Sequence, residues 1–497
     1  MIDRHIQNKQ NIDRDSLVIY NLLMRAFQKC ENYSVGYKNL IGIFFHDLLR
    51  ILTSLVYKIH ETKNGLIIPE LKNKKVTNFP YIDYNDIDSS ENHKDIDTTT
   101  VYKNYLDHNL KTILTKNIVN LFSKESTRIA FTGNSLNYFK IMKMFQKNRF
   151  HVSYPNISTI YIEKYDLQFD IMVKYLREIL VNINFDNFNL IQNIIKSHIE
   201  NFVGRDSNYD PTKGFDLLVT GTTCDIQNRL LAVETKSRGK PVIGIAHGES
   251  CDTLDEPNLS YGEYSYGDYY IGYGKDIERL RKDSKYLEKT LYSSQKWYGG
   301  TSEKIENIYD QKSRLKKVSD FISPKFMYVP TSLTGMSPYG PFRSFSDKSY
   351  IKWHKNIIKS FPNLIVKAHF KGFKHIENLS GLITKRFESV LDSADIFIFD
   401  YVSTALTIAI ATNKPIIFFN LNINKLTSIA KKTIKKRCIW IDINSISDKN
   451  LYSKVMSNQD IEMENEFTEN YCISDTDYSR EDEVLELIKN ISNQKAS

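Results

Sequence analysis

The chain has 497 residues, more than one ordinary hydrophobic core supports, so two packed domains are expected. Hydrophobic residues make up 41% of the sequence, including 31 Tyr and 27 Phe, and this content excludes a largely disordered chain. The net charge of +8 is spread along the sequence without a known nucleic-acid-binding motif, so no nucleic-acid partner is expected.

The five cysteines are odd in number and scattered, and none forms a CxxC pair. This pattern excludes a disulfide framework and a zinc ribbon, and it favours a reducing compartment. The first 14 residues are polar and charged, which is not typical of a signal peptide. We therefore expect a cytoplasmic protein, with the inner face of the cytoplasmic membrane as an alternative location.

The N-terminal part of the sequence, residues 1–120, is predicted to be a helical extension followed by a polar loop. Residues 16–60 have a helical pattern, and residues 61–100 have the composition of a loop. Charged side chains interrupt the apolar stretch 40–57, so it is not expected to cross a membrane. Its helical spacing leaves two interpretations: a helix packed on the protein, or an interfacial helix that gives peripheral membrane association.

Two successive blocks of alternating strands and helices follow. The first block has predicted strands at 128–132, 158–162, 215–220 and 241–246, and predicted helices at 136–145, 171–181, 188–202 and 225–238. After a weakly patterned stretch at 275–317, the second block has predicted strands at 326–330, 364–368, 395–399, 415–419 and 438–441, and predicted helices at 347–360, 404–411 and 480–491. Short apolar strands that alternate with helices indicate parallel sheets covered on both faces, an α/β fold class with two Rossmann-like domains.

The most informative segment is 393–419, which is predicted to be a strand, a short loop, a helix and a second strand. Ser403 and Thr404 fall at the start of the helix, where free backbone N–H groups and the positive end of the helix dipole attract phosphate. The alternative is that Ser403 is only an N-cap.

The pattern Asp400-Tyr401-x-Ser403-Thr404, followed by a helix, Lys414-Pro415 and an apolar strand, resembles the donor-binding signature of certain GT-B transferases. It is similar to that of the CDP-glycerol glycerophosphotransferases and of bacterial capsule transferases, including polysialyltransferases. The resemblance covers roughly residues 215–445. It implies that Asp400, Ser403 and Thr404 line the nucleotide pocket, and that the two domains face one another across a cleft.

Two further strand ends of the second block are predicted to contact the donor. Lys367 and His369 follow a strand in the form of the Lys-x-His-Pro motif of these families, with Phe370 in the place of proline. A cation and a hydrogen-bond donor at that position suit the neutralisation of a leaving phosphate. Thr331 and Ser332 follow the first strand of the block and provide hydroxyl groups for the same pocket.

Candidates for the acceptor side lie in the first block. His247-Gly248-Glu249 resembles the Gln-His-Gly turn of surface-carbohydrate transferases, with Ala246 in the place of Gln, and either His247 or Glu249 could accept a proton from the acceptor hydroxyl. Asp225 is a third candidate catalytic residue or simply the N-cap of helix 225–238. Gly133, Asn134 and Ser135 end the first strand and are candidates for acceptor binding.

The Tyr- and Gly-rich stretch 261–270 has two interpretations: aromatic platforms for sugar rings, or a packed surface loop. No metal-ligand motif was found, so a metal-independent enzyme without a cofactor is expected.

Together these features predict a glycosyltransferase with an acceptor domain at 121–300 and a nucleotide-donor domain at 301–497. It would move a sugar, or a polyol phosphate, from a nucleotide-activated donor to a lipid-linked or growing bacterial cell-surface glycan such as a capsule polysaccharide. The resemblance favours CMP- or CDP-linked donors. The alternatives are a sugar-nucleotide epimerase and a non-catalytic GT-B scaffold in a glycan-assembly complex.

Overall fold

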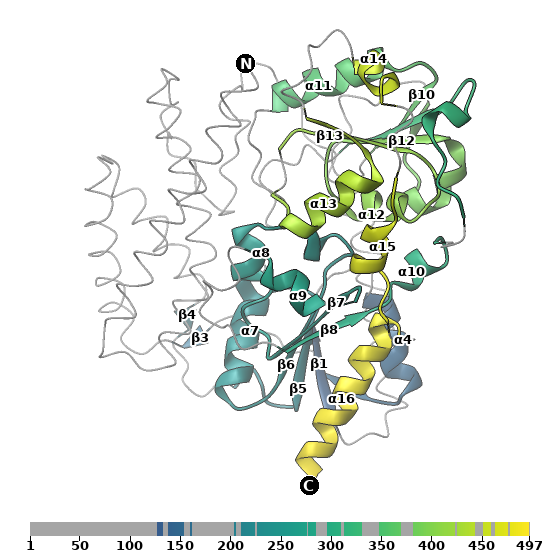
Figure 1. Cartoon of the computed structure of the whole chain (residues 1–497). Coiled ribbons are helices and arrows are strands. Elements are labelled where there is room, and N and C mark those ends of the chain that lie inside the picture. The colour runs from purple at the N-terminus through teal and green to yellow at the C-terminus, as the bar shows by residue number, and fades with distance from the viewer. Residues whose placement is uncertain are drawn as a thin grey trace, which may run out of the picture. The chain divides into compact units, whose positions relative to one another are not determined.

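A computed structural model of the chain (Figure 1) describes fifteen stretches of the sequence, and all structural statements below concern these residues. They are 127–132, 138–153, 160–161, 203–204, 210–223, 226–275, 277–284, 296–309, 313–330, 347–368, 381–422, 425–442, 451–458, 463–475 and 478–496. The predicted N-terminal extension 1–120 and the helices predicted at 171–181 and 188–202 lie outside the described residues.

The first sheet has six strands in the order β2-β1-β5-β6-β7-β8. The pairings of β1 with β2 and β5, and of β7 with β6 and β8, are parallel. The strands are β1 Arg128–Thr132, β2 His151–Ser153, β5 Leu217–Thr220, β6 Val242–Ile245, β7 Tyr269–Tyr273 and β8 Lys296–Gly300. Apart from this sheet, β3 (Ile160–Tyr161) pairs with β4 (Val203–Gly204) in a two-stranded parallel sheet.

The second sheet also has six strands, in the order β11-β10-β9-β12-β13-β14, and every adjacent pair is parallel. The strands are β9 Phe326–Val329, β10 Leu364–Lys367, β11 Leu382–Ile383, β12 Ile396–Phe399, β13 Ile416–Asn420 and β14 Ile439–Asp442. Counted along the chain this order is 3-2-1-4-5-6, the doubly wound order whose direction reverses between its first and fourth strands. That switch point lies between β9 and β12.

The helices connect and cover the strands (Figure 1). Those near the first sheet are α4 Tyr138–Lys147, α7 Ile226–Ser237, α8 Pro257–Gly262, α9 Ile277–Lys282 and α10 Glu303–Glu306, with the 3₁₀ turn η2 Cys251–Thr253. The remaining helices are α11 Asp347–Ser360, α12 Thr404–Ile410, α13 Ser428–Arg437, α14 Leu451–Met456, α15 Glu466–Tyr471 and α16 Arg480–Ala496, with the 3₁₀ turns η4 Val318–Asp320 and η6 Phe387–Ser393. The two parallel, helix-covered sheets confirm the predicted α/β class.

The chain divides into two compact units. One comprises Met1–Asp3, Ser135–Met144 and Ile243–Ser497, and the other comprises Arg4–Asn134 and Phe145–Val242. The candidate site described below lies within the first of these units. The predicted domain boundaries at 120 and 300 stay predictions.

The central strands of the second sheet are buried because both of their faces are covered. All four residues of β9 and of β12, and all five of β13, are buried. Such strands need apolar side chains at every position rather than at alternate positions. The runs Phe-Met-Tyr-Val, Ile-Phe-Ile-Phe and Ile-Ile-Phe-Phe meet this requirement, and for this reason these strands were predicted within one residue of their observed bounds.

The last helix, α16, returns to the first sheet and packs against β7 and β8 (Figure 1). The segment before it pairs with the end of β8 through a parallel bridge between Thr301 and Ser479. Glycine permits this approach, because a Cβ atom at Gly300 would lie only 2.3 Å from the Cα of Arg480. The linear order of the sequence does not indicate this return.

Three strands of the first sheet, β2, β7 and β8, were not predicted, and the strand predicted at 158–162 corresponds to β3 of the separate two-stranded sheet. Strand β7 begins inside the Tyr- and Gly-rich stretch, and β8 lies in the stretch 275–317. Tyr264 and Tyr270 are fully buried and pack edge to face at 4.8 Å, each beside Trp297 of β8. These two tyrosines belong to the core and Tyr270 to a strand, so the interpretation as a packed surface loop does not hold for them.

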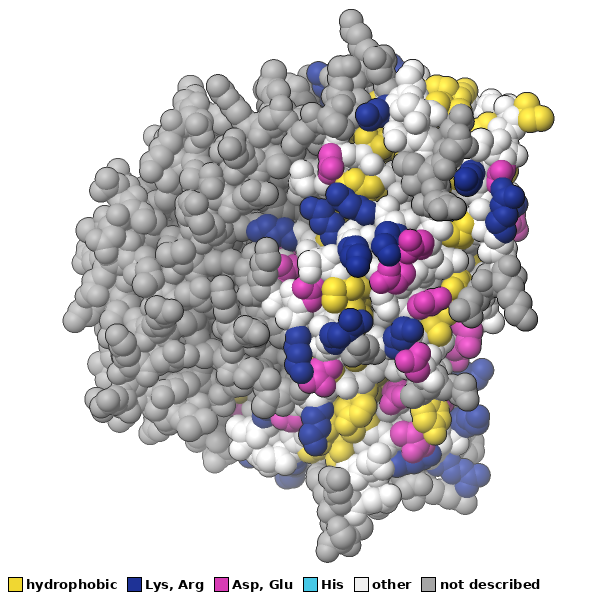
Figure 2. Space-filling view, in the orientation of Figure 1, with side chains coloured by type: hydrophobic (Ala, Val, Ile, Leu, Met, Phe, Trp, Pro, Cys, Tyr) yellow, Lys and Arg dark blue, Asp and Glu magenta, His cyan; other side chains and the backbone are white. Residues whose placement is uncertain are grey.

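Charged side chains of both signs are interspersed on the face shown in Figure 2. Among the described residues, ion pairs join charges of opposite sign, such as Lys436 with Glu464 and Glu466 at 2.8 and 3.0 Å. Among the described residues on this face, Lys and Arg are therefore not gathered into one basic stripe.

Replacing Gly300 with alanine should separate the start of α16 from β8, because the new methyl group would overlap the backbone of Arg480. We expect a loss of about 1–3 kcal/mol of stability, measured by denaturant unfolding and followed by the intrinsic fluorescence of the three tryptophans. Gly239→Ala is the control: its φ of +68° strains any side chain, but no atom lies within 4 Å of the new methyl group. Equal losses in the two variants would contradict the close approach.

Candidate functional site

The switch point of the second sheet places the end of β12 beside the end of β9. Asp400 follows β12 directly and is only 2% exposed. Its Oδ2 accepts hydrogen bonds from the Tyr328 hydroxyl on β9 and from the Trp353 indole N–H on α11, the latter at 3.0 Å. This carboxylate therefore anchors the loop between β12 and α12 to the sheet and to α11. A direct contact between Asp400 and a donor stays a prediction.

The loop leads into α12 through Ser403, which is the N-cap of that helix. Its backbone is extended, with φ −153° and ψ 169°, and its hydroxyl accepts a hydrogen bond from the Leu406 N–H at 3.4 Å. Ser403 and Thr404 are half-buried. The hydroxyl groups are thus held at the edge of the sheet where doubly wound folds bind ligands.

The turn that follows β6 in the first sheet contacts this helix start. A Cβ atom at Gly248 would lie 3.0 Å from the Thr404 Oγ1, so a larger residue at position 248 would press on the helix. Gly248 lies between the two residues predicted as the base, His247 and Glu249. The fold therefore brings together two motifs that are more than 150 residues apart in the sequence.

A second set of contacts lies beside the first and ties the chain after β6 to the start of α13. The N–H of Asp255 donates to the Lys425 carbonyl at 2.8 Å, and the N–H of Thr427 donates to the Thr253 carbonyl at 3.1 Å. The N–H of Lys425 donates to the Glu256 Oε1 at 2.8 Å. These bonds fix the segment that follows the turn 247–249.

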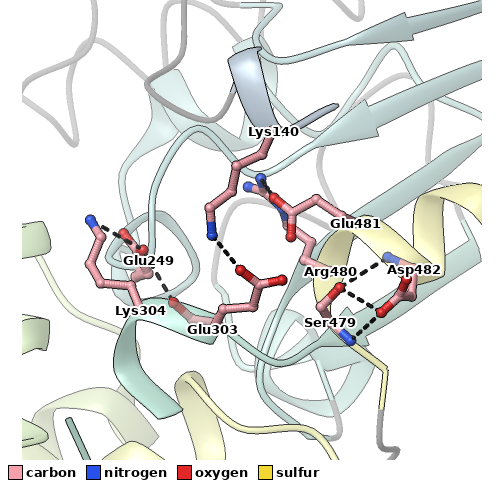
Figure 3. Close-up of polar contacts among 9 residues, drawn as sticks. Lys140, Glu249, Glu303, Lys304, Ser479, Arg480, Glu481 and Asp482 are labelled. Atoms are coloured by element: carbon pink, nitrogen blue, oxygen red, sulfur yellow. Dashed lines mark hydrogen bonds and ion pairs between the residues drawn. The ribbon is translucent and has the colours of Figure 1, made fainter. Parts of the chain in front are cut away.

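Glu249 is buried, 5% exposed, among side chains of α10 and its N-cap (Figure 3). Its Oε1 accepts a hydrogen bond from the Ser302 hydroxyl at 3.3 Å and lies 3.9 Å from the Lys304 Nζ. Lys304 makes a shorter ion pair, 2.8 Å, with Oε1 of Glu388 on η6. Burial by itself would raise the pKa of Glu388, but the hydrogen bond from Lys304 is among the contacts that lower it below its ordinary value.

Lys367 is the last residue of β10 and is half-buried. Its Nζ donates to the Ala368 carbonyl at 2.7 Å. Burial lowers the pKa of Lys367, and the negative charge of Glu388 opposes that shift. Glu388 thus acts electrostatically on two lysines. Lys304 lies on α10, and Lys367 lies at the end of β10 in the second sheet.

Arg480, the first residue of α16, is fully buried and contacts the chain directly before the turn 247–249. It donates to the Ala246 carbonyl at 3.1 Å, pairs with Glu481 at 2.7 Å and lies 4.8 Å from the centre of the Tyr273 ring. Burial would lower the pKa of Arg480, but the neighbouring Tyr273, Glu481 and Glu249 raise it overall. The guanidinium is therefore a permanent cation beneath the turn.

Several predicted site residues lie outside the described residues, and their roles stay predictions. They are Gly133, Asn134 and Ser135 on the acceptor side, Asp225, and the donor candidates Thr331, Ser332 and His369. The structure brings together His247, Glu249, Lys367, Asp400, Ser403 and Thr404 within one unit.

Three residues of the site were missed by sequence reasoning: Lys304, Glu388 and Arg480. Lys304 lies in the weakly patterned stretch and Glu388 in a 3₁₀ turn, and neither has a local signal. Arg480 does have a local sequence signal. It is a cation at the start of α16, directly before Glu481, Asp482 and Glu483, and the helix dipole makes a cation unfavourable at that end. A cation at such an unfavourable position indicates that a distant part of the chain supplies its partner.

No group of three or more His, Cys, Asp or Glu that could hold a metal ion occurs among the described residues. Within the same part of the chain, no helix combines the length and the apolar character needed to span a bilayer.

No protein-family model matches the sequence, and no curated protein matches it significantly. Among solved structures, MurG of Acinetobacter baumannii is 7% identical with a TM-score of 0.36, over 73% of this chain and 99% of the other. HepE of Anabaena, solved with UDP and glucose, is 10% identical with a TM-score of 0.34, over 75% and 100%. The glycosyltransferase SnogD of Streptomyces nogalater is 12% identical with a TM-score of 0.33, over 73% and 99%. Such low values assign neither a family nor an activity to this chain.

Replacing Asp400 with alanine should leave two buried donors, the Tyr328 hydroxyl and the Trp353 indole N–H, without an acceptor. We expect a loss of about 2–4 kcal/mol in the free energy of unfolding. Asp442→Ala is the matched control, because this exposed carboxylate also ends a strand of the second sheet and accepts hydrogen bonds from an amide and an indole. Water can replace it, so its loss should cost less than about 1 kcal/mol. A reversed order would refute the anchoring role of Asp400.

Proposed function

We propose that this chain is a GT-B glycosyltransferase that uses a nucleotide-activated sugar. The observation that supports this proposal most directly is the contact between Gly248 and Thr404. It puts a turn with an imidazole and a carboxylate beside hydroxyl groups at the ligand-binding edge of a doubly wound sheet. A group-transfer enzyme needs this combination, a base next to a site for the leaving group.

In this proposal the second sheet binds the donor. Ser403 and Thr404 donate hydrogen bonds to the donor phosphates, and Lys367 supplies a positive charge at the end of β10. Thr331, Ser332 and His369 complete the pocket, and Asp400 keeps its loop in place through Tyr328 and Trp353. The proposal includes no metal ion, since the cations that face the leaving phosphate are protein side chains.

His247 is the proposed base. It is half-buried, whereas Glu249 is 5% exposed and already faces Ser302 and Lys304, so an acceptor hydroxyl reaches the imidazole more readily. The hydroxyl oxygen attacks the anomeric carbon, the bond from that carbon to the phosphate oxygen breaks, and its electron pair leaves with the nucleotide. The hydroxyl proton passes to His247, and Lys367 neutralises the phosphate that departs.

The proposed acceptor is a lipid-linked or growing surface glycan, met on the cytoplasmic side of the membrane. The resemblance of the motif around Asp400 to CDP-glycerol and capsule transferases favours a cytidine nucleotide as the donor's carrier. A polyol phosphate would be transferred from a CDP-polyol by attack of the acceptor hydroxyl at the phosphorus that carries the polyol. The bond from that phosphorus to the bridging oxygen would break and CMP would leave, while His247 takes the hydroxyl proton.

A thermal-shift screen against CMP, CDP, UDP, GDP and ADP tests the donor site. A nucleotide present at 100 times its dissociation constant should add about 2.7 kcal/mol of stability. In Lys367→Ala the loss of a charge-assisted contact should weaken that nucleotide about 10- to 100-fold. Lys359→Ala, which removes an exposed lysine from the last turn of α11, should leave the affinity unchanged. If no nucleotide raises the melting temperature, the proposed donor site is refuted, and the alternative of a non-catalytic GT-B scaffold is favoured.

The base is tested by His247→Asn. We expect kcat to fall about 10²- to 10⁴-fold, because general base catalysis contributes that much, while nucleotide binding stays intact. The control is His151→Asn, which replaces a half-buried histidine on β2. This variant should be fully active. Turnover of the nucleotide sugar without any acceptor would instead identify an epimerase.

A further inference from the structure

Two segments that are far apart in the sequence pair directly with each other within one compact unit. Residues 253–256 follow β6 of the first sheet, and residues 425–427 follow β13 of the second sheet. Leu254 of one segment faces Leu426 of the other in an antiparallel bridge. We call the two segments together the connector, because they join a loop of one sheet to a loop of the other.

Three hydrogen bonds cross the connector. The N–H of Asp255 donates to the Lys425 carbonyl at 2.8 Å, and the N–H of Thr427 donates to the Thr253 carbonyl at 3.1 Å. The N–H of Lys425 donates to the Glu256 Oε1 at 2.8 Å. At most 4% of the surface is exposed in four of these residues, Thr253, Asp255, Glu256 and Thr427. Separating the two segments is therefore costly, because it breaks hydrogen bonds between buried groups.

The first segment is also held from its own side of the connector. Asp252, directly before it, is 1% exposed, and its Oδ1 accepts hydrogen bonds from the hydroxyls of Tyr264 and Tyr270 at 3.2 and 3.3 Å. The Ser284 hydroxyl donates to the Asp255 Oδ1 at 2.9 Å. These bonds fix the segment to β7 and to the chain after α9.

The second segment leads into α13, and a residue after α9 reaches the start of that helix. The Oδ1 of Asp283 accepts a hydrogen bond from the Ser428 hydroxyl at 2.5 Å, and its Oδ2 accepts one from the Ile429 N–H at 2.9 Å. A carboxylate at a helix N-terminus is favourable, because free N–H groups and the helix dipole attract it. Thr427, the N-cap of α13, shares a hydrogen bond of 3.2 Å with the buried Tyr471 hydroxyl.

We propose that the connector is a permanent joint that stays closed while a nucleotide binds and leaves, so that the turn 247–249 and the loop after β13 are held as one body. Both loops are close to it along the chain: Thr253 is four residues after Glu249, and Lys425 is five residues after Asn420, the end of β13. The nucleotide in this inference rests on the proposed function, whereas the closed joint does not.

A disulfide across the bridge tests whether the joint opens. The hydrogen bonds join the residues on either side of Leu254 and Leu426, so these two form a non-hydrogen-bonded pair with Cα atoms about 4.5 Å apart, a separation that a disulfide can span. Leu254→Cys with Leu426→Cys should therefore form a disulfide on oxidation. In a thermal-shift titration with CMP, CDP, UDP, GDP and ADP, the oxidised and reduced forms should bind the same nucleotide with dissociation constants within about 2-fold.

The reduced form of the same double variant is the matched control, since it lacks both leucine side chains but has no cross-link. All of these variants also carry Cys251→Ser, which removes the natural thiol nearest in sequence to position 254. Peptide mass mapping shows whether the bond joins positions 254 and 426. If no disulfide forms, or if the oxidised form binds its nucleotide about 10-fold or more weakly until it is reduced, the joint opens and the inference is wrong.

Hydrogen exchange of the unmodified full chain, followed by mass spectrometry, keeps the joint separate from the proposed reaction. Peptides that cover 253–256 and 425–429 should exchange as slowly as those of β13, with and without the five nucleotides, because a closed joint opens only with the core. Slow exchange in a protein that binds none of the nucleotides would support the joint and reject the proposed donor site. Exchange much faster than in β13 would overturn the joint even in an active enzyme.

Discussion

The buried guanidinium of Arg480 joins the last helix of the chain to the turn that follows β6. It donates to the Ala246 carbonyl one residue before His247, and it reaches that carbonyl because Gly300 lets the backbone of α16 lie against β8. A buried cation is costly unless it is paired and hydrogen-bonded. Tyr273 and Glu481 supply those partners, so α16 can lie on β7 and β8 while its first residue supports the candidate site.

The turn held in this way lies between groups of opposite charge. Arg480 lies behind it, Lys304 lies to one side, and Glu388 links Lys304 electrostatically to Lys367. Glu249 thus does not stand alone as a buried carboxylate. Glu388 thus pairs with Lys304, which lies near Glu249, and its charge also acts on Lys367 at the end of β10.

For some residues of the site the neighbouring sequence predicts the structural role, and for others it does not. Ser403 was predicted as an N-cap and as a donor ligand, and its N-cap geometry is confirmed, because capping depends on neighbours three residues away. Asp400 was predicted at the end of a strand and is found there, but its partners on β9 and α11 come from 72 and 47 residues away. Lys304 and Glu388, 84 positions apart in the numbering, could not be paired from sequence because nothing local distinguishes either from a solvated surface charge.

The sequence by itself determined the α/β class and most strands of the second sheet, because strands buried on both faces need continuous apolar runs that are visible in one dimension. It also determined which strand ends carry polar residues. The tertiary structure alone decided that β7 and β8 complete the first sheet, that α16 returns to it, and that Gly248 meets Thr404. These features depend on close approaches between distant segments, and such contacts leave no periodic pattern in the chain.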